Sequence, residues 1–278
     1  MSELDSFIAS VEGKSVNTIK SYKSQYNKLY KLLGKNIGET SEAKLLSTID
    51  TIDNVNGKQA LINIAIQIRR MDMYKLSVKK LEAEREKNKH KLIEKVKDTN
   101  LKLQNSLPSY RELVDYMESL YKASSWTDYI INYLLINYQV RNLDLLFDIV
   151  KRKKDTKDTT KNYIWLAPKK VVYIRNVYKT ASTYHKKTIT ITDPKFMTAI
   201  KRVFACQKHN EDCGVFIPNP DQVGYYILNS TYKKIGEGAY FKVVVSHFRD
   251  NLDKIKEISE NRGTKVETIL NSYDIENV

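Results

Sequence analysis

Three side chains in the second half of the chain are of types that can act together on a phosphodiester. Arg141 stands three residues before Asp144, Lys179 lies downstream in a Lys-rich segment, and Tyr273 lies near the C-terminus. A planar guanidinium can donate two parallel hydrogen bonds to phosphate oxygens, and an ammonium can protonate a departing oxygen. A phenol, with an ordinary pKa of ~10, becomes a nucleophile when positive charge lies beside it. The three types are therefore compatible with phosphoryl transfer.

Each of these residues also has an ordinary structural explanation. Arg141 could pair with Asp144 across one helical turn at the surface. Lys179 shares its segment with other lysines, any of which could position a phosphate. Tyr273 is one of nineteen tyrosines, most of which must be packing residues. The lysines that share the segment of Lys179 are Lys169, Lys170, Lys186 and Lys187.

The composition favours a folded protein with an anionic partner. Of the 278 residues 41% are hydrophobic, which excludes a wholly disordered chain, and the net charge of +14 indicates nucleic acid first. An acidic membrane surface would also attract this charge, but no run of ~20 apolar residues is present, and the first residues lack the basic start of a signal peptide. We expect a soluble, intracellular protein without a membrane partner. A scaffolding protein that binds nucleic acid nonspecifically is the plainest alternative.

The cysteines do not predict a metal site. Cys206 and Cys213 are the only two in the sequence, and with His209 between them they offer three soft ligands. A closed structural zinc site needs a fourth ligand. We therefore expect two reduced thiols near a helix end, with neither a metal nor a disulfide.

The N-terminal part of the chain has the periodicity of short amphipathic helices. Ser15 can cap a helix whose apolar residues recur at steps of three and four before Gly34 ends it. A second helix is expected over 41–52, and a third starts near Asn56. These helices predict a compact N-terminal domain over residues 1–74.

Residues 75–104 are dominated by Lys and Glu, with few apolar positions. This pattern predicts an extended helix with a solvated surface that links two domains. A DNA-facing role for its basic residues is the alternative to a plain wet surface. Those residues are Arg85, Lys87, Lys89 and Lys91.

The remaining part, residues 105–278, predicts a mixed helical domain. Short β-branched and aromatic runs, separated by Lys-rich turns, predict a small antiparallel three-stranded sheet. Asp193 followed by Pro194 starts a further helix, and the last third returns to helical periodicity. The fold class is therefore mainly α, of the α+β type. The helices expected before and between these runs are 110–117 and 129–138, and the expected strands are 163–165, 171–177 and 188–191.

The chain resembles the tyrosine recombinases of the phage-type integrase family. Residues 140–145, Val-Arg-Asn-Leu-Asp-Leu, are similar to the first active-site box of that family. Residues 17–22, in which Asn-Thr precedes Tyr by four positions, are similar to the start of its helical core-binding domain. Lys179 and Tyr273 follow Arg141 in the order of the family. The resemblance covers nearly the whole chain except the long Lys/Glu helix.

The resemblance implies a site-specific DNA recombinase or integrase that closes two domains around double-stranded DNA. Tyr273 would attack a backbone phosphate to leave a 3′-phosphotyrosyl enzyme, Arg141 would clamp the phosphate, and Lys179 would protonate the departing 5′-oxygen. No metal or nucleotide cofactor is implied, and strand exchange would occur in a homotetramer on DNA. Such a protein would stay with DNA, in a prokaryotic cytoplasm or, for a virus or mobile element, in a host nucleus or viral factory. We predict DNA contacts from Lys20, Lys23, Arg69, Arg70, Lys169, Lys170, Lys186 and Lys187.

The second active-site box of the family, His-x-x-Arg, is altered in this chain. Its best fit runs from Ala239 to Lys242, where alanine cannot move a proton and lysine cannot grip a phosphate bidentately. His247 and Arg249 could compensate, and Arg262, in the region of the family's Gly-His, is a candidate third cation. Two hypotheses follow. The chain is either an active recombinase or a catalytically impaired, recombinase-derived DNA-binding protein.

Overall fold

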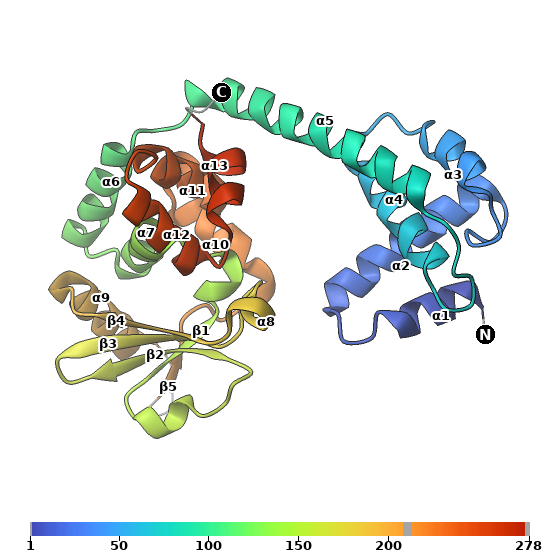
Figure 1. Ribbon diagram of the computed structural model, residues 1–278. Helices are drawn as coiled ribbons and strands as arrows, with labels where there is room; N and C mark the ends of the chain where they lie inside the picture. The colour runs from blue at the N-terminus through green and yellow to red at the C-terminus, as the bar shows by residue number, and fades with distance from the viewer. Residues whose placement is uncertain (1, 208–212, 276–278) are drawn as a thin grey trace. The chain divides into compact units, whose positions relative to one another are not determined.

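The computed structural model describes residues 2–207 and 213–275 of the chain. Two compact units, Met1–Asp98 and Thr99–Val278, make up the fold and are called unit 1 and unit 2 (Figure 1). The long helix α5 (Lys79–Gln104) begins in unit 1 and ends in unit 2. None of the described helices combines the length and the apolar character that a membrane span requires.

Unit 1 is built from short, capped helices. The Ser15 hydroxyl accepts a hydrogen bond from the Thr18 amide at 3.2 Å, and Gly34 ends the same helix with a φ of 70°, a conformation that favours glycine. Both predicted helix ends are confirmed. The apolar sides of the helices enclose a core around Phe7, Leu29 and Leu61. The helices are α1 (Glu3–Ser10), α2 (Val16–Leu33), α3 (Glu42–Ile49) and α4 (Val55–Arg69), followed by the first turns of α5.

The helices of unit 2 start at clear local signals. Ser109 and Glu112 form a reciprocal capping box, in which each side chain accepts a hydrogen bond from the other residue's backbone amide. The Asp193 carboxylate accepts a hydrogen bond from the Phe196 amide at 2.9 Å, with Pro194 as the first helical residue, which confirms the predicted helix start. The α-helices after α5 are α6 (Tyr110–Lys122), α7 (Trp126–Tyr138), α8 (Ala181–Tyr184), α9 (Pro194–Cys206), α10 (Val223–Ser230), α11 (Gly236–His247), α12 (Leu252–Arg262) and α13 (Val266–Tyr273).

The strands of unit 2 form, in the described part of the chain, one five-stranded mixed sheet in the order β4-β3-β2-β1-β5. β1 and β2 run parallel, whereas the other neighbours are antiparallel. Ile149, Ile164 and Tyr173 belong to the main core that the sheet shares with the helices of this unit (Figure 1). The prediction of an α+β fold is confirmed, but the predicted sheet of three antiparallel strands is wrong. The strands are β1 (Phe147–Val150), β2 (Asn162–Ala167), β3 (Lys170–Arg175), β4 (Lys187–Ile191) and β5 (Cys213–Val215).

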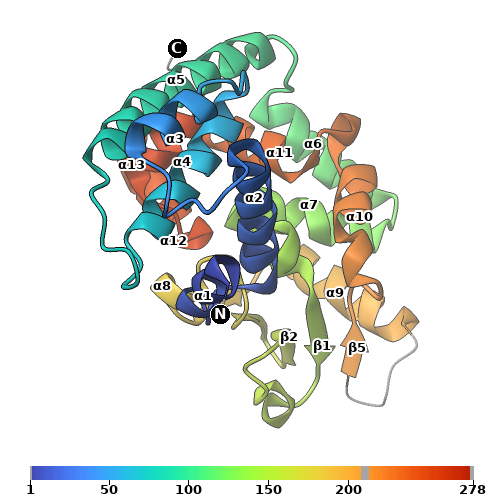
Figure 2. The same cartoon turned by 90° about the vertical axis from the view of Figure 1, so that its right-hand side faces the viewer.

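β1 and β5 lack a strand signal of their own in the sequence. β1 has four residues and directly follows the 3₁₀ turn η1 (Asn142–Leu145), so its apolar residues continue the pattern of the preceding helix. β5 has three residues and pairs with β1 through Asp148 and Val215, which are far apart in the chain (Figure 2). These two strands exist because of tertiary pairing, which local periodicity does not encode.

Asn162, the first residue of β2, ties η1 to the sheet. Its side-chain amide donates to the carbonyls of Leu143, Leu146 and Val177 at 3.4, 3.3 and 2.9 Å. Its carbonyl oxygen accepts from the amides of Asn176 and Val177 at 2.9 and 2.8 Å. Asn162 is buried, so its own polar atoms need these partners inside the protein. The turn that carries the arginine box is therefore fixed to β2 and to the segment after β3.

The substitution Asn162→Ala is expected to lower the free energy of unfolding by about 2–3 kcal/mol, because it removes all the hydrogen bonds by which this side chain ties η1 and the segment after β3 to β2. Denaturant unfolding of the full chain measures this loss. Asn162→Asp keeps an acceptor but turns a carboxylate oxygen towards the carbonyls of Leu143, Leu146 and Val177, so its effect should be at least as large as that of alanine. A loss below about 0.5 kcal/mol for alanine would contradict the role assigned to this side chain.

Candidate active site

Arg141 lies at the junction between α7 and η1 and is held from its backbone and from one side of its guanidinium. Its backbone amide donates to Asp144 Oδ2 at 2.6 Å, and its Nη2 donates to Thr264 Oγ1 at 2.9 Å. The other terminal nitrogen, Nη1, is buried and has no hydrogen-bond partner among the described residues. A half-buried guanidinium with one unused donor edge is suited to bind an anion.

Asp144 does not pair with the side chain of Arg141 but with Arg175 of β3. The Nη2 atom of Arg175 lies 2.5 Å from Asp144 Oδ2, and both side chains have an exposed fraction of 0%. Arg175 Nη1 donates to the Asn261 carbonyl at 2.7 Å, which connects β3 to α12. Burial raises the pKa of the Asp144 carboxyl, and the charge of Arg175 opposes this rise. The alternative of a surface ion pair between Arg141 and Asp144 therefore does not describe this turn.

Arg262, the last residue of α12, is buried beside the backbone that leads into Arg141. Its Nη1 atom donates to the carbonyls of Gln139 and Val140 at 3.0 Å each, and its Nη2 atom pairs with Glu237 of α11. Its charge, after the effect of burial, lowers the pKa of the Arg141 guanidinium. The structure therefore brings Arg262 close to Arg141, but the hydrogen bonds of Arg262 are largely used within the protein.

Gly263 allows α12 and the turn after β3 to approach each other closely. It has a φ of 62°, and a Cβ atom at this position would lie 2.5 Å from Thr180 Oγ1. The Thr180 hydroxyl donates to the Gly263 carbonyl at 3.0 Å. Because Thr264 follows directly and holds Arg141, this contact joins the turn that contains Lys179 to the arginine.

Tyr273 is the last residue of α13 and is half-buried. Its ring meets the Phe241 ring edge-on, with the centroids 4.7 Å apart, and the Arg262 guanidinium lies 4.3 Å from the Phe241 centroid. Tyr273 is close enough to Arg141 for its charged form to raise the pKa of that guanidinium. No described residue forms a hydrogen bond with its hydroxyl. The structure therefore brings a free phenol into the neighbourhood of Arg141 and Arg262.

Two lysines near Arg141 differ in their surroundings. Lys179 is exposed, and its ammonium forms no hydrogen bond or ion pair within the described residues. Lys187, at the start of β4, is half-buried, donates to the Glu260 carbonyl, and lies over the rings of Tyr178 and Tyr184 at 5.3 and 5.5 Å. Burial, followed by the charge of Arg175 and assisted by that of Arg141, lowers the pKa of Lys187 to about 8.

Lys187 was predicted only as a DNA contact, although the structure brings it near Arg141 and Arg175. Together with Arg262 these two residues are called the arginine cluster. Lys186 lies just before β4 and is exposed, whereas Lys187 starts the alternation of half-buried and exposed residues along the strand, and this alternation could have distinguished them. The sequence also did not single out Arg175, Glu237 or Thr264. Arg175 ends an apolar strand run, which is a signal for a buried charge with a partner, but nothing local identifies that partner.

Lys242 of the altered second box, and the two residues that could compensate for it, His247 and Arg249, contact residues other than Arg141. Lys242 Nζ donates to Asn100 Oδ1 at 2.7 Å, and burial lowers the pKa of this ammonium. His247 is exposed and stacks on Tyr110, with the ring centroids 4.1 Å apart. Arg249 Nε lies 3.7 Å from Asp274 Oδ2. Within the described residues these contacts connect none of the three to Arg141 directly.

The residues predicted to contact DNA differ in exposure. Arg69 is buried and donates to the carbonyls of Thr40 and Ser77 at 2.6 and 3.0 Å, so its guanidinium serves the fold of unit 1. Arg70 is exposed and pairs with Glu82 at 2.6 Å. Exposed side chains that remain candidates are Lys20, Lys23, Lys169, Lys170 and Lys186.

The possible metal ligands are not grouped in the described part of the chain. No cluster of three or more His, Cys, Asp or Glu side chains with suitable placement occurs among the described residues. Cys206 is exposed, and His209 lies outside the described residues.

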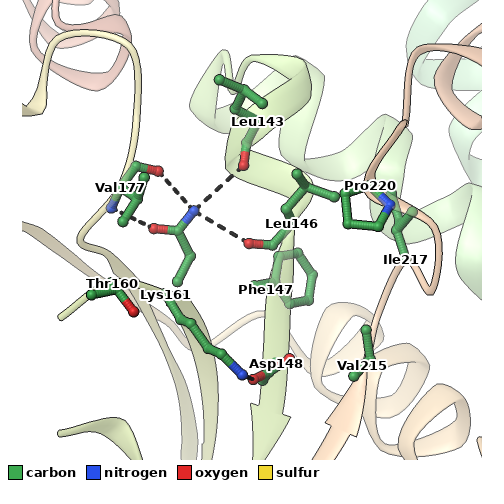
Figure 3. A pocket seen from close by; sticks show the side chains of 11 residues that line it. Leu143, Leu146, Phe147, Asp148, Thr160, Lys161, Val177, Val215, Ile217 and Pro220 are labelled. Carbon is green, nitrogen blue, oxygen red and sulfur yellow. Dashed lines mark hydrogen bonds and ion pairs between the residues drawn. The ribbon is translucent and has the colours of Figure 1, made fainter. Parts of the chain in front are cut away.

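An apolar pocket of about 360 Å³ lies beside η1 (Figure 3). Leu143, Leu146 and Phe147 form one wall, and Val215 with Ile217 forms the other. The pocket is thus built from the turn that also carries Arg141.

Comparison with known proteins gives little similarity. No model of a known protein family matches the chain, and no curated protein matches it. Among solved structures, the crystal structure of XerA recombinase matches with a TM-score of 0.39 and 13% sequence identity, over 98% of this chain and 92% of that chain. At these values the similarity is weak and identifies neither a family nor an activity.

The depressed pKa of Lys187 predicts a pH-dependent stability. An unfolded lysine has a pKa near 10.5, so between pH 8 and 10.5 the unfolded chain binds a proton that the folded chain has lost, and stability rises with pH. Lys187→Met should therefore remove this rise, and its stability relative to wild type should decrease across that range. Denaturant unfolding at several pH values measures it. Lys186→Met is the matched control, and equal pH profiles for the two variants would contradict the assignment.

Proposed function

We propose that the chain is a tyrosine recombinase that cuts and rejoins double-stranded DNA through a 3′-phosphotyrosyl intermediate. The observation that carries this proposal is that two groups without a hydrogen-bond partner among the described residues, the buried Nη1 donor of Arg141 and the Tyr273 hydroxyl, lie in one positively charged region. A phosphodiester needs such a pair, because its non-bridging oxygens gain negative charge as the phenol attacks.

In this mechanism Arg141 binds a non-bridging oxygen of the scissile phosphate. The oxygen of Tyr273 forms the new bond to phosphorus, the bond from phosphorus to the 5′-oxygen breaks, and the phenolic proton passes to water. The reverse attack by a 5′-hydroxyl of another strand reseals the backbone. Arg262 contributes its charge and the placement of Arg141, since its own donors hold carbonyls and Glu237.

Lys187 is the better candidate for the proton donor to the 5′-oxygen, ahead of Lys179. A general acid works best when its pKa lies near the working pH, and the pKa of Lys187 is lowered to about 8. Its environment also includes Arg141 and Arg175, whose charges act on it. Lys179, on the anchored turn before Thr180, is the alternative donor.

The exposed lysines of units 1 and 2 would contact the DNA backbone, and the protein would act on DNA as a homotetramer at the place in the cell where that DNA lies. The net charge of +14 supports an anionic partner. Membership of a virus or mobile element belongs to the same proposal.

A second candidate function is a DNA-binding protein that has lost cleavage. Two features favour it: Tyr240 of the second box is buried and donates to Asn132 at 2.5 Å, and Glu237, just before the box, pairs with Arg262. The loss of one electrostatic donor in a comparable site raises the activation free energy by about 2.7–4 kcal/mol, which slows the reaction without abolishing it. Slow cleavage is therefore the expected behaviour of the first candidate.

The test is a covalent-adduct assay with a nicked suicide duplex. The duplex carries a site recovered by sequencing DNA that co-purifies with the protein from its native host. Wild type should give a protein–DNA band on a denaturing gel, Tyr273→Phe should give none, and Arg141→Ala should reduce the rate by roughly 10²–10³. Binding of the duplex by wild type without any adduct would favour the second candidate.

The proton donor is tested with a duplex whose scissile 5′-oxygen is replaced by sulfur. A thiolate leaves without protonation, so a variant that lacks the general acid should regain its rate on this duplex. Lys187→Met is expected to be slow on the oxygen duplex and close to wild type on the sulfur duplex, while Lys179→Met should show little difference between them. The opposite pattern would assign the proton to Lys179.

A further inference from the structure

The altered second box contains a lysine whose ammonium is directed to another side chain. Lys242 Nζ donates to Asn100 Oδ1 at 2.7 Å, and Asn100, near the end of α5, has an exposed fraction of 1%. Both residues belong to unit 2. An ammonium held in this way by a buried amide is poorly placed to grip a phosphate at the same time.

The other end of the Asn100 amide holds the backbone on both sides of Tyr273. Asn100 Nδ2 donates to the Ser272 carbonyl and to the Asp274 carbonyl, at 3.4 Å each. One side chain thus contacts the residue before the phenol and the residue after it. The hydrogen bond from Lys242 fixes which end of the Asn100 amide faces the carbonyls, because an ammonium can only donate and must meet the oxygen.

The residues after Tyr273 are fastened a second time by α11. Ser246 Oγ lies 3.3 Å from Asp274 Oδ1 and accepts from the Ile275 amide at 2.9 Å. Arg249 adds a contact of 3.7 Å to the same Asp274, which is buried. The short helix α13 has Ile269 as its buried residue and no side-chain cap at its start, so these contacts supply much of what orders its end.

We propose that Lys242 and Asn100 form a clamp that positions Tyr273, so that the lysine of the altered second box acts on the nucleophile through Asn100 and not on the DNA phosphate. The clamp itself stands on the contacts above, and its effect on cleavage rests on the proposed recombinase function. Lys242 and Asn100 are positioning residues. A misplacement of a reacting group by about 1 Å can slow a reaction on the order of 10²-fold. Greater mobility of the backbone on either side of Tyr273 would therefore lower the rate of cleavage.

The experiment compares Asn100→Ala, Lys242→Met and the double variant in the full chain. Lys102→Met removes an exposed ammonium from the same helix as Asn100 and is the charge-matched control. On the nicked suicide duplex, each single variant should slow adduct formation roughly 10-fold to 100-fold with the DNA affinity unchanged. The double variant should be no slower than the slower single variant, because both substitutions break one chain of contacts.

A second readout does not depend on cleavage. Hydrogen exchange of the peptide that spans residues 270–275 should be faster in both single variants than in wild type and in Lys102→Met. Asn100→Asp keeps an acceptor for Lys242 but removes the donors to Ser272 and Asp274. It should therefore behave like alanine in both measurements, and it replaces alanine if that variant fails to fold.

The outcomes separate the clamp from the proposed function. If Lys242→Met slows adduct formation while Asn100→Ala does not, Lys242 acts directly on DNA and the clamp is overturned. The clamp is also overturned if both variants slow it and the double variant is slower than either by the product of the two effects. Unchanged exchange in Asn100→Ala also overturns it. If wild type forms no adduct but exchange rises in both variants, the clamp stands and the recombinase proposal fails.

Discussion

The buried ion pair between Asp144 and Arg175 is the contact on which the site of unit 2 depends. Asp144 receives the Arg141 amide, and its own carbonyl accepts from the Tyr173 hydroxyl at 2.6 Å. Arg175 extends the connection to the Asn261 carbonyl at the end of α12. Two opposite charges without solvent contact are costly to desolvate, and removal of one partner from such a pair destabilises other proteins by about 3–5 kcal/mol. The pair therefore favours one arrangement of η1, β3 and α12, because each buried charge has its partners only when these three elements meet.

The same arrangement determines which cations are available for a ligand. Arg175 forms an ion pair with Asp144. The guanidinium of Arg262 donates to two carbonyls and pairs with Glu237. The Nη1 atom of Arg141 has no partner among the described residues, and the pKa of Lys187 is lowered to about 8. Within the described residues, a site with several positive charges but a single unpaired guanidinium nitrogen on Arg141 would bind a phosphate with fewer directed hydrogen bonds than a site with two free arginines. This difference is the physical reason why a slow enzyme and a binding protein are the two functions to distinguish.

Features that depend on neighbouring residues in the chain could be predicted from the sequence, whereas pairings between distant segments could not. Ser15, Gly34 and Asp193 mark helix ends because capping involves residues two to four positions apart. β2, β3 and β4 carry runs of β-branched and aromatic residues, but β1 and β5 are too short for a clear run. At the site, Arg141, Arg262 and Tyr273 were selected by their order and lie in one region. The roles of Lys187, Lys242 and Arg69 depend on Glu260, Asn100 and Thr40, and no local pattern reveals those partners.

The end of α5 has a practical consequence for where the chain can be divided. The sequence suggested that the second domain starts at residue 105, after the charged helix, whereas the compact unit starts at Thr99. The difference contains Asn100, whose amide contacts Ser272 and Asp274. A protein fragment that begins at residue 105 would keep every residue of the arginine cluster and still leave the last turn of α13 without its support. Fragments meant to keep this support should therefore begin upstream of Thr99, inside the charged helix.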